Sequence, residues 1–150
     1  MQYDESLLSD REKVVLEKLY RASKIIDELF LEQVYSKNNQ IKSELISKVE
    51  DKPSLELKPE LELQLELINI MFGPFDRLED NEPFIGTDKK PLGANFYPED
   101  MTKEEFEKWI KDNPKDEKSF TSEFTIIRRE NGKLVAIPYS EYFKDKLTEA

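Results

Sequence analysis

Two strand-like runs that meet at an Asn-Gly pair constrain the fold of this chain more than any other local feature. The runs cover residues 124–129 and 133–138, and both contain β-branched side chains. Asn131 and Gly132 tolerate the positive φ angles that a type I′ turn requires at both of its central positions. The sequence therefore predicts a β-hairpin within residues 123–138.

Helical periodicity dominates the first part of the chain. Ser9 and Glu12 have the spacing of a capping box, which pairs backbone N–H groups at a helix start. The apolar residues that follow recur every three or four positions and predict one buried stripe on a helix that ends near residue 36. They are Val15, Leu19, Ala22, Ile26, Leu29 and Phe30. Residues 38–39 are both Asn and are expected to separate this helix from a second one over residues 40–49.

Residues 55–70 support two interpretations. Leucines alternate with polar residues, as in a half-buried strand. However, Leu, Glu and Gln are strong helix formers, and Pro59 suits a first helical turn. A helix over residues 60–71 is favoured.

Asp, Pro and Gly make residues 73–101 a loop, within which Phe84 and Ile85 are expected to form a short strand. A helix over residues 102–112 follows, because Thr102 and Glu105 repeat the capping-box spacing.

The chain is therefore expected to be α+β, mainly helical with a β-hairpin near the C-terminus. It is interpreted as a single domain, with a helical segment at 1–52 and a mixed segment at 53–150. Ser140 is expected to cap a last helix.

Charge and composition exclude several classes of partner. The formal net charge of −10 repels phosphate backbones and anionic lipid surfaces, so neither nucleic acid nor a membrane is an expected partner. No apolar run approaches the roughly 18–20 residues that span a bilayer, and the first residues lack the pattern of a secretion signal. We expect a cytoplasmic protein, or an exported one whose signal is already removed. The hydrophobic fraction of 37% predicts a thin core.

The chain has no histidine and no cysteine. This excludes Ser-His and Cys-His nucleophile pairs and every zinc site that needs imidazole or thiolate ligands. The four glycines form neither a Rossmann nor a P-loop motif. The sequence thus predicts no catalytic residue, no metal ligand and no cofactor in this chain.

One loop segment is a candidate binding element. Asn95, Phe96 and Tyr97 follow a Gly-Ala pair and precede Pro98, which stiffens the loop just before a capped helix. Such a loop is able to present aromatic side chains in a cleft, although packing in the core is the simpler role for each ring.

Arg128, Arg129 and Lys133 form a small basic cluster on the predicted hairpin. Side chains alternate between the two faces of a strand, so one of the two arginines faces solvent by default. A surface role is therefore favoured over anion binding for this cluster.

Three segments carry a family resemblance. The sequences GPFDRLEDNEPFIG (residues 73–86), GANFYPEDMTKEEFEKW (93–109) and AIPYSEYF (136–143) resemble the amino-terminal part of bacterial members of the dipeptidyl peptidase III family. The order and approximate spacing of the segments match, and they cover about half of the chain.

The resemblance implies a two-lobed zinc peptidase, with zinc held by a His-Glu-x-x-x-His motif and a later Glu-Glu motif. Neither is present, since Glu104-Glu105 continues as Phe-Glu-Lys-Trp. The resemblance thus implies a partial lobe that is inactive alone and builds the cleft wall opposite the zinc site. Its expected partners are the missing zinc lobe and, in the complete protein, a peptide substrate that contacts Phe96 and Tyr97. Zinc is expected only in that complete protein.

In the family the helix after the hairpin continues, whereas here it stops at Ala150, so truncation is the simplest expectation. One alternative is a free-standing module that binds a peptide or protein through its aromatic face without catalysis. Another is an acidic helical domain unrelated to peptidases. A Nudix activity is not expected, because Arg129-Glu130 leads directly into Asn-Gly.

Overall fold

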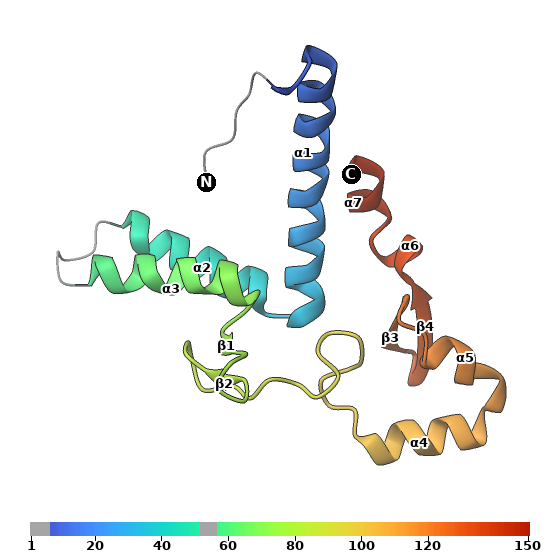
Figure 1. Ribbon diagram of the computed structural model, residues 1–150. Helices are drawn as coiled ribbons and strands as arrows, with labels where there is room; N and C mark the ends of the chain where they lie inside the picture. Colours follow the sequence, from blue (N-terminus) through green and yellow to red (C-terminus); the bar gives the residue numbers. More distant parts are fainter. Residues whose placement is uncertain (1–6, 52–56) are drawn as a thin grey trace.

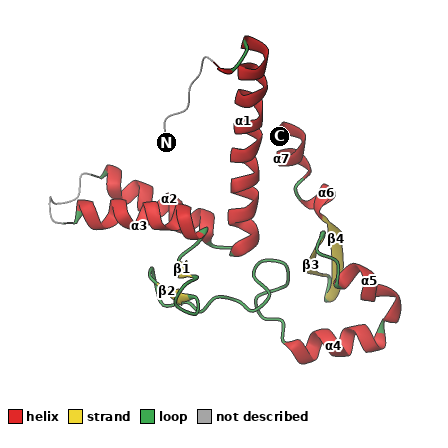
Figure 2. Ribbon diagram, in the orientation of Figure 1, coloured by secondary structure: helices red, strands yellow, loops and turns green. Residues whose placement is uncertain are grey.

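The computed structural model describes residues 7–51 and 57–150. Helices make up most of it, with two small antiparallel strand pairs (Figures 1 and 2). This confirms the α+β, mainly helical class. The elements in chain order are α1 (Asp10–Val34), α2 (Asn38–Glu50), α3 (Lys58–Met71), β1 (Phe75–Asp76), β2 (Glu82–Pro83), α4 (Lys103–Asp112), η2 (Pro114–Asp116), α5 (Glu117–Phe120), β3 (Thr125–Glu130), β4 (Lys133–Pro138), α6 (Tyr139–Tyr142) and α7 (Lys144–Glu149).

Helix α1 begins as predicted. The Ser9 backbone N–H donates to the Glu12 carboxylate over 2.7 Å, and the Ser9 hydroxyl accepts from the Glu12 backbone N–H over 3.4 Å. The helix ends at Val34. Asn38 donates its side-chain amide to the carbonyl of Leu31 over 2.7 Å, which satisfies one of the acceptors left free at the end of α1.

Helices α2 and α3 pack side by side in antiparallel directions (Figure 1). Leu45 of α2 and Ile68 of α3 meet Leu31 of α1 in one buried cluster. The helical interpretation of residues 60–71 is therefore correct, whereas the expected boundary at residues 52–53 lies outside the described residues.

The short strand expected at Phe84 and Ile85 is wrong. The observed pair joins β1 to β2, with Phe75 opposite Pro83. Residues 80–81 have φ angles of 51° and 63°, so the chain reverses there, and the strand pairing ends in a single hydrogen bond of 2.9 Å from the Phe84 N–H to the Pro74 carbonyl. Phe84 and Ile85 instead pack against the Ile68 cluster.

The predicted β-hairpin is present as β3 and β4. Asn131 and Gly132 have φ angles of 49° and 77°, as a type I′ turn requires. The register places Glu130 opposite Lys133.

Both faces of this hairpin are covered. Ile126 lies in a cluster with Leu29 of α1 and Phe143. Its neighbour Ile127 points the opposite way, into a cluster with Phe120 and Leu134. The hairpin is thus a partition between two small cores.

The last helices return along α1. Helix α6 starts at Tyr139 after Pro138, without a side-chain cap, so the expected capping role of Ser140 is wrong: the serine lies inside the first turn. Helix α7 lies beside α1 (Figure 1), where Lys146 reaches Glu28 at 3.8 Å and Glu32 at 3.7 Å. Within residues 7–51 and 57–150, no helix combines the length and apolar character of a membrane span.

Candidate functional site

A pocket of about 380 Å³ lies over the loop that precedes α4. Its walls come from residues 91–94, 97–99 and 101–103 and from Phe106 of that helix. Tyr97 lines it, and Leu92 stands at its edge with a fully exposed side chain. The walls are mainly apolar, so an apolar side chain is the kind of group that fits here.

Tyr97 is held firmly in this pocket. Its hydroxyl donates to the carbonyl of Phe120 over 3.0 Å, and its ring meets Phe106 edge to face at 5.6 Å. Burial raises the pKa of the Tyr97 hydroxyl, so the side chain stays neutral. Gly93 makes this position possible, because a Cβ there would lie 2.7 Å from the Tyr97 ring.

The other two predicted residues point away from the pocket. Asn95 binds the end of α1: its backbone N–H donates to the Gln33 carbonyl over 3.0 Å and its side chain to the Glu32 carbonyl over 2.8 Å. The Phe96 ring packs against Tyr139 at 5.9 Å. Of the three candidates, Tyr97 lines the pocket, while Asn95 and Phe96 fasten the loop to its surroundings. A contact of any of them with a peptide stays a prediction.

Arg128 completes this fastening, and sequence reasoning missed its role. Its guanidinium donates to the backbone and side-chain oxygens of Asn95, each over 3.0 Å, and to the carbonyl of Ile127 over 2.8 Å. It also lies 5.1 Å from the centre of the Tyr142 ring. All of these acceptors are uncharged oxygens. Asn95 lies 33 residues away in the sequence, and the Ile127 acceptor is a backbone carbonyl, so no local sequence pattern predicts these contacts.

Arg129 faces the opposite way and has acidic partners. It forms a two-point contact with Glu105 at 2.7 and 2.8 Å and also reaches Asp100. This arginine lowers the pKa of the Glu105 carboxyl. The surface role expected for Arg129 is therefore specific: it ties β3 to the first turn of α4. Thr102 still caps that helix by accepting from the Glu105 N–H over 3.1 Å.

A second polar cluster lies beside α2. The Tyr35 hydroxyl and the Lys37 ammonium both donate to Asp88, over 2.9 and 2.7 Å. Lys37 and then Tyr35 lower the pKa of the Asp88 carboxyl through these hydrogen bonds. The cluster ties the long loop back to the helices, and it borders a pocket of about 330 Å³.

The residues of this chain do not fit a zinc site. Imidazole and thiolate ligands are absent from the sequence, and residues 7–51 and 57–150 hold no group of three or more acidic side chains that is able to enclose a metal ion.

Comparisons with known proteins agree with this organisation. No family model matches the chain. A curated relative, Nudix hydrolase 3 from Arabidopsis thaliana, is 26% identical over 95% of this chain and 24% of its own length. The solved structure of DPP III from Caldithrix abyssi is 60% identical and superposes with a TM-score of 0.86.

That match covers 97% of this chain and 26% of the Caldithrix abyssi chain. The chain thus spans about a quarter of the length of both proteins. An identity of 60% with one fold throughout confirms the resemblance that the three sequence motifs indicate: this chain corresponds to part of a dipeptidyl peptidase III.

Proposed function

We propose that this chain is a non-catalytic portion of a zinc-dependent peptidase of the dipeptidyl peptidase III type, where it builds the lobe and cleft wall opposite the zinc site. The observation that carries the proposal is the match to a quarter of DPP III from Caldithrix abyssi at 60% identity. A sequence without histidine or cysteine supports a scaffold role, because the ligands that zinc prefers have to come from elsewhere.

The pocket beside Tyr97 is the proposed wall that meets the peptide. It combines an apolar lining with a rigid aromatic side chain, which suits the side chain of a bound peptide. Peptide substrate and zinc both belong to the complete protein in this proposal. A Nudix activity is not part of this proposal, despite the name of the Arabidopsis relative. Arg129 and Glu130, the pair considered for a Nudix box, lie in a strand of the β-hairpin.

A chimera tests the proposal. The chain replaces the matched quarter of the Caldithrix abyssi protein, and hydrolysis of a fluorogenic dipeptide substrate is measured with zinc present. We expect turnover by the chimera and none above the buffer blank by the isolated chain. Turnover by the isolated chain refutes the scaffold role.

Two matched substitutions in the chimera test the cleft wall. Leu92 and Leu78 are both exposed, so Leu92→Ala and Leu78→Ala leave stability nearly unchanged. Only Leu92 borders the Tyr97 pocket, and its loss is expected to lower kcat/KM about tenfold. Equal kcat/KM values for the two variants would remove the pocket from the proposal. An isolated chain that is monodisperse, unfolds cooperatively and binds peptides through this pocket favours the free-standing module instead.

A further inference from the structure

Within residues 7–51 and 57–150, the first half of α1 has no packing partner. Every residue from 10 to 21 is exposed, whereas Leu29, Leu31 and Val34 near the other end of the helix are buried. Figure 1 shows the beginning of α1 rising beyond the other labelled helices and strands, with α7 beside the helix farther along and α2 and α3 near its other end. This half of the helix is a projecting arm.

An apolar face begins on the arm and continues along the second half of α1. Val15, Leu19, Ile26 and Phe30 are exposed to 55%, 61%, 56% and 39%, and their spacings of four, seven and four place them on one side of the helix. We call these four residues the α1 face. Arg21 lies on the opposite side and is paired with Glu17, as suits a surface in contact with water.

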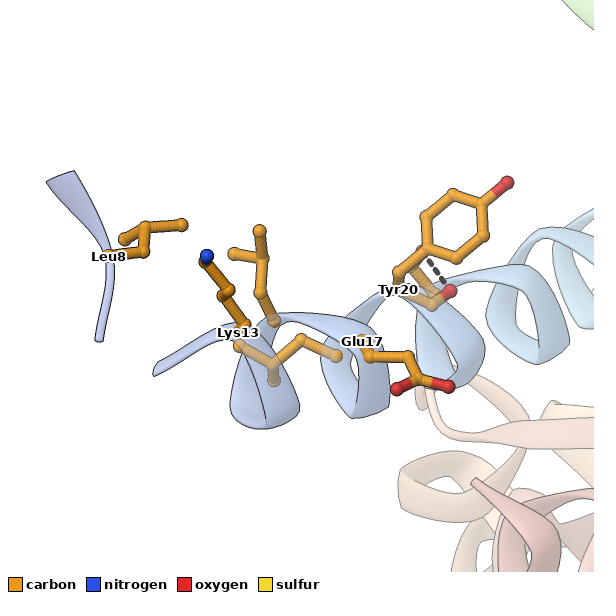
Figure 3. Close-up of a pocket in the computed structure, with 7 residues that line it drawn as sticks. Leu8, Lys13, Glu17 and Tyr20 are labelled. Atoms are coloured by element: carbon orange, nitrogen blue, oxygen red, sulfur yellow. Dashed lines mark hydrogen bonds between the residues drawn. The ribbon is translucent and has the colours of Figure 1, made fainter. Parts of the chain in front are cut away.

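Two hollows lie along α1, and in the described part of the chain one of them has no opposing wall. Among the residues that the structure describes, the larger, of about 630 Å³, is lined by members of the segment 8–23. Figure 3 shows Leu8, Lys13, Glu17 and Tyr20 around it, all from α1 and the turn before it. The other, of about 460 Å³, continues the α1 face past Ile26 and Phe30 to Leu147 of α7. A polypeptide laid along the arm would supply the missing wall.

The exposure of the arm indicates that another polypeptide segment packs against it. Helices in proteins gain most of their stability from the packing of an apolar face, and the described residues supply no such packing to residues 10–21. The accessible surface points the same way: it is 11557 Å², against roughly 8,000 Å² for a compact protein of this mass. The excess of about 3,500 Å² is larger than the roughly 800 Å² that each partner buries in a standard interface, so it is sufficient for contact with further polypeptide.

We propose that the α1 face is the docking surface for the remainder of a dipeptidyl peptidase III-like polypeptide, which contributes an apolar surface against it. The occupant is argued from length: the solved protein matches this chain over 97% of its residues, yet almost three quarters of that protein lie outside the match. The inference rests on the proposed function, and it assigns the contact to a specific helix. A second copy of this chain is the competing occupant.

Cysteine labelling tests the contact directly, because the chain has no thiol of its own. Val15→Cys and Leu19→Cys place a thiol on the α1 face, and Arg21→Cys is the matched control on the opposite side. Maleimide labelling of each site is followed by mass spectrometry of the corresponding peptide, in the isolated chain and in the chimera. In the isolated chain all three sites are expected to react at similar rates. In the chimera, labelling at positions 15 and 19 is expected to slow about tenfold or more relative to position 21.

Equal labelling at all three sites in a folded chimera overturns the inference. Protection of positions 15 and 19 in the isolated chain, lost on dilution, also overturns it and assigns the face to a second copy. Peptidase activity of the same chimera reports on the proposed function separately. A protected arm in an inactive chimera refutes the function alone, an active chimera with an unprotected arm refutes the docking surface alone, and a chimera that does not fold contradicts both.

Discussion

Replacing Ile126 by alanine probes how the hairpin joins the two sides of the fold. Ile126 is 1% exposed and packs against Leu29 and Phe143, so it links β3 to α1 and to the chain just before α7. The substitution removes three buried carbon atoms, about 0.8 kcal/mol each in transfer free energy, and leaves a cavity. We expect the free energy of unfolding to fall by about 3 kcal/mol, which lowers Tm by roughly 6–12 °C.

The control is the same substitution on the α1 face. Ile26 is 56% exposed, so Ile26→Ala in the isolated chain is expected to change the free energy of unfolding by less than about 0.5 kcal/mol. Identical chemistry at the two positions removes side-chain type as an explanation. Any difference then measures burial.

The assay is urea unfolding followed by the fluorescence of Trp109, the single tryptophan, and in parallel by circular dichroism. Trp109 stacks on Phe120 at 5.9 Å and belongs to the cluster on the other face of the hairpin. A shift of the Trp109 transition by Ile126→Ala therefore shows that both faces unfold together. Equal effects of the two substitutions would refute the importance of burial at Ile126. A Trp109 transition that Ile126→Ala leaves in place would refute the coupling of the two cores through the hairpin.

Three further outcomes follow from the contacts described. Asn38→Ala removes two hydrogen bonds to backbone carbonyls in a buried site and is expected to cost about 1–3 kcal/mol in urea unfolding; an unchanged midpoint contradicts it. Gly93→Ala brings a Cβ within 2.7 Å of the Tyr97 ring, so Tm should fall by several degrees, and an unaltered Tm shows that the ring moves freely. Arg129 lowers the pKa of Glu105, so their pair stabilises the fold above the ordinary carboxyl pKa near 4.5 and ceases to do so as pH falls through the lowered value. The Tm difference between wild type and Glu105→Gln should therefore be present at pH 7 and shrink as the pH is lowered below 4.5, and a difference that is constant with pH excludes the ion pair as its cause.

Local sequence rules identified the elements whose causes are local. The capping box at Ser9 needs only residues within one turn, and the turn at Asn131 and Gly132 needs only their tolerance of positive φ. Both were predictable for that reason. Phe84 and Ile85 were wrongly predicted to form a strand. Their apolar side chains pack against the cluster that contains Ile68 of α3, a contact between separate segments that local rules do not detect.

The candidate site was predictable in part. Tyr97 was recognisable as an aromatic residue on a stiffened loop, and it lines the pocket. The role of Asn95 was not, since its partners on α1 lie 63 residues away in sequence. The clamp that Arg128 makes on Asn95 spans 33 residues and was equally invisible. The prediction of one buried stripe on α1 is wrong for most of its length, because Leu29 is buried whereas Val15, Leu19, Ile26 and Phe30 are exposed.

The most direct test of the account is the peptidase assay on two proteins side by side, with zinc added to both. We expect the 150-residue chain to give no hydrolysis above the blank. We expect the chimera, which carries this chain in place of the matched quarter of the Caldithrix abyssi protein, to hydrolyse the dipeptide substrate. Hydrolysis by the chain alone, or a folded chimera without activity, would contradict it.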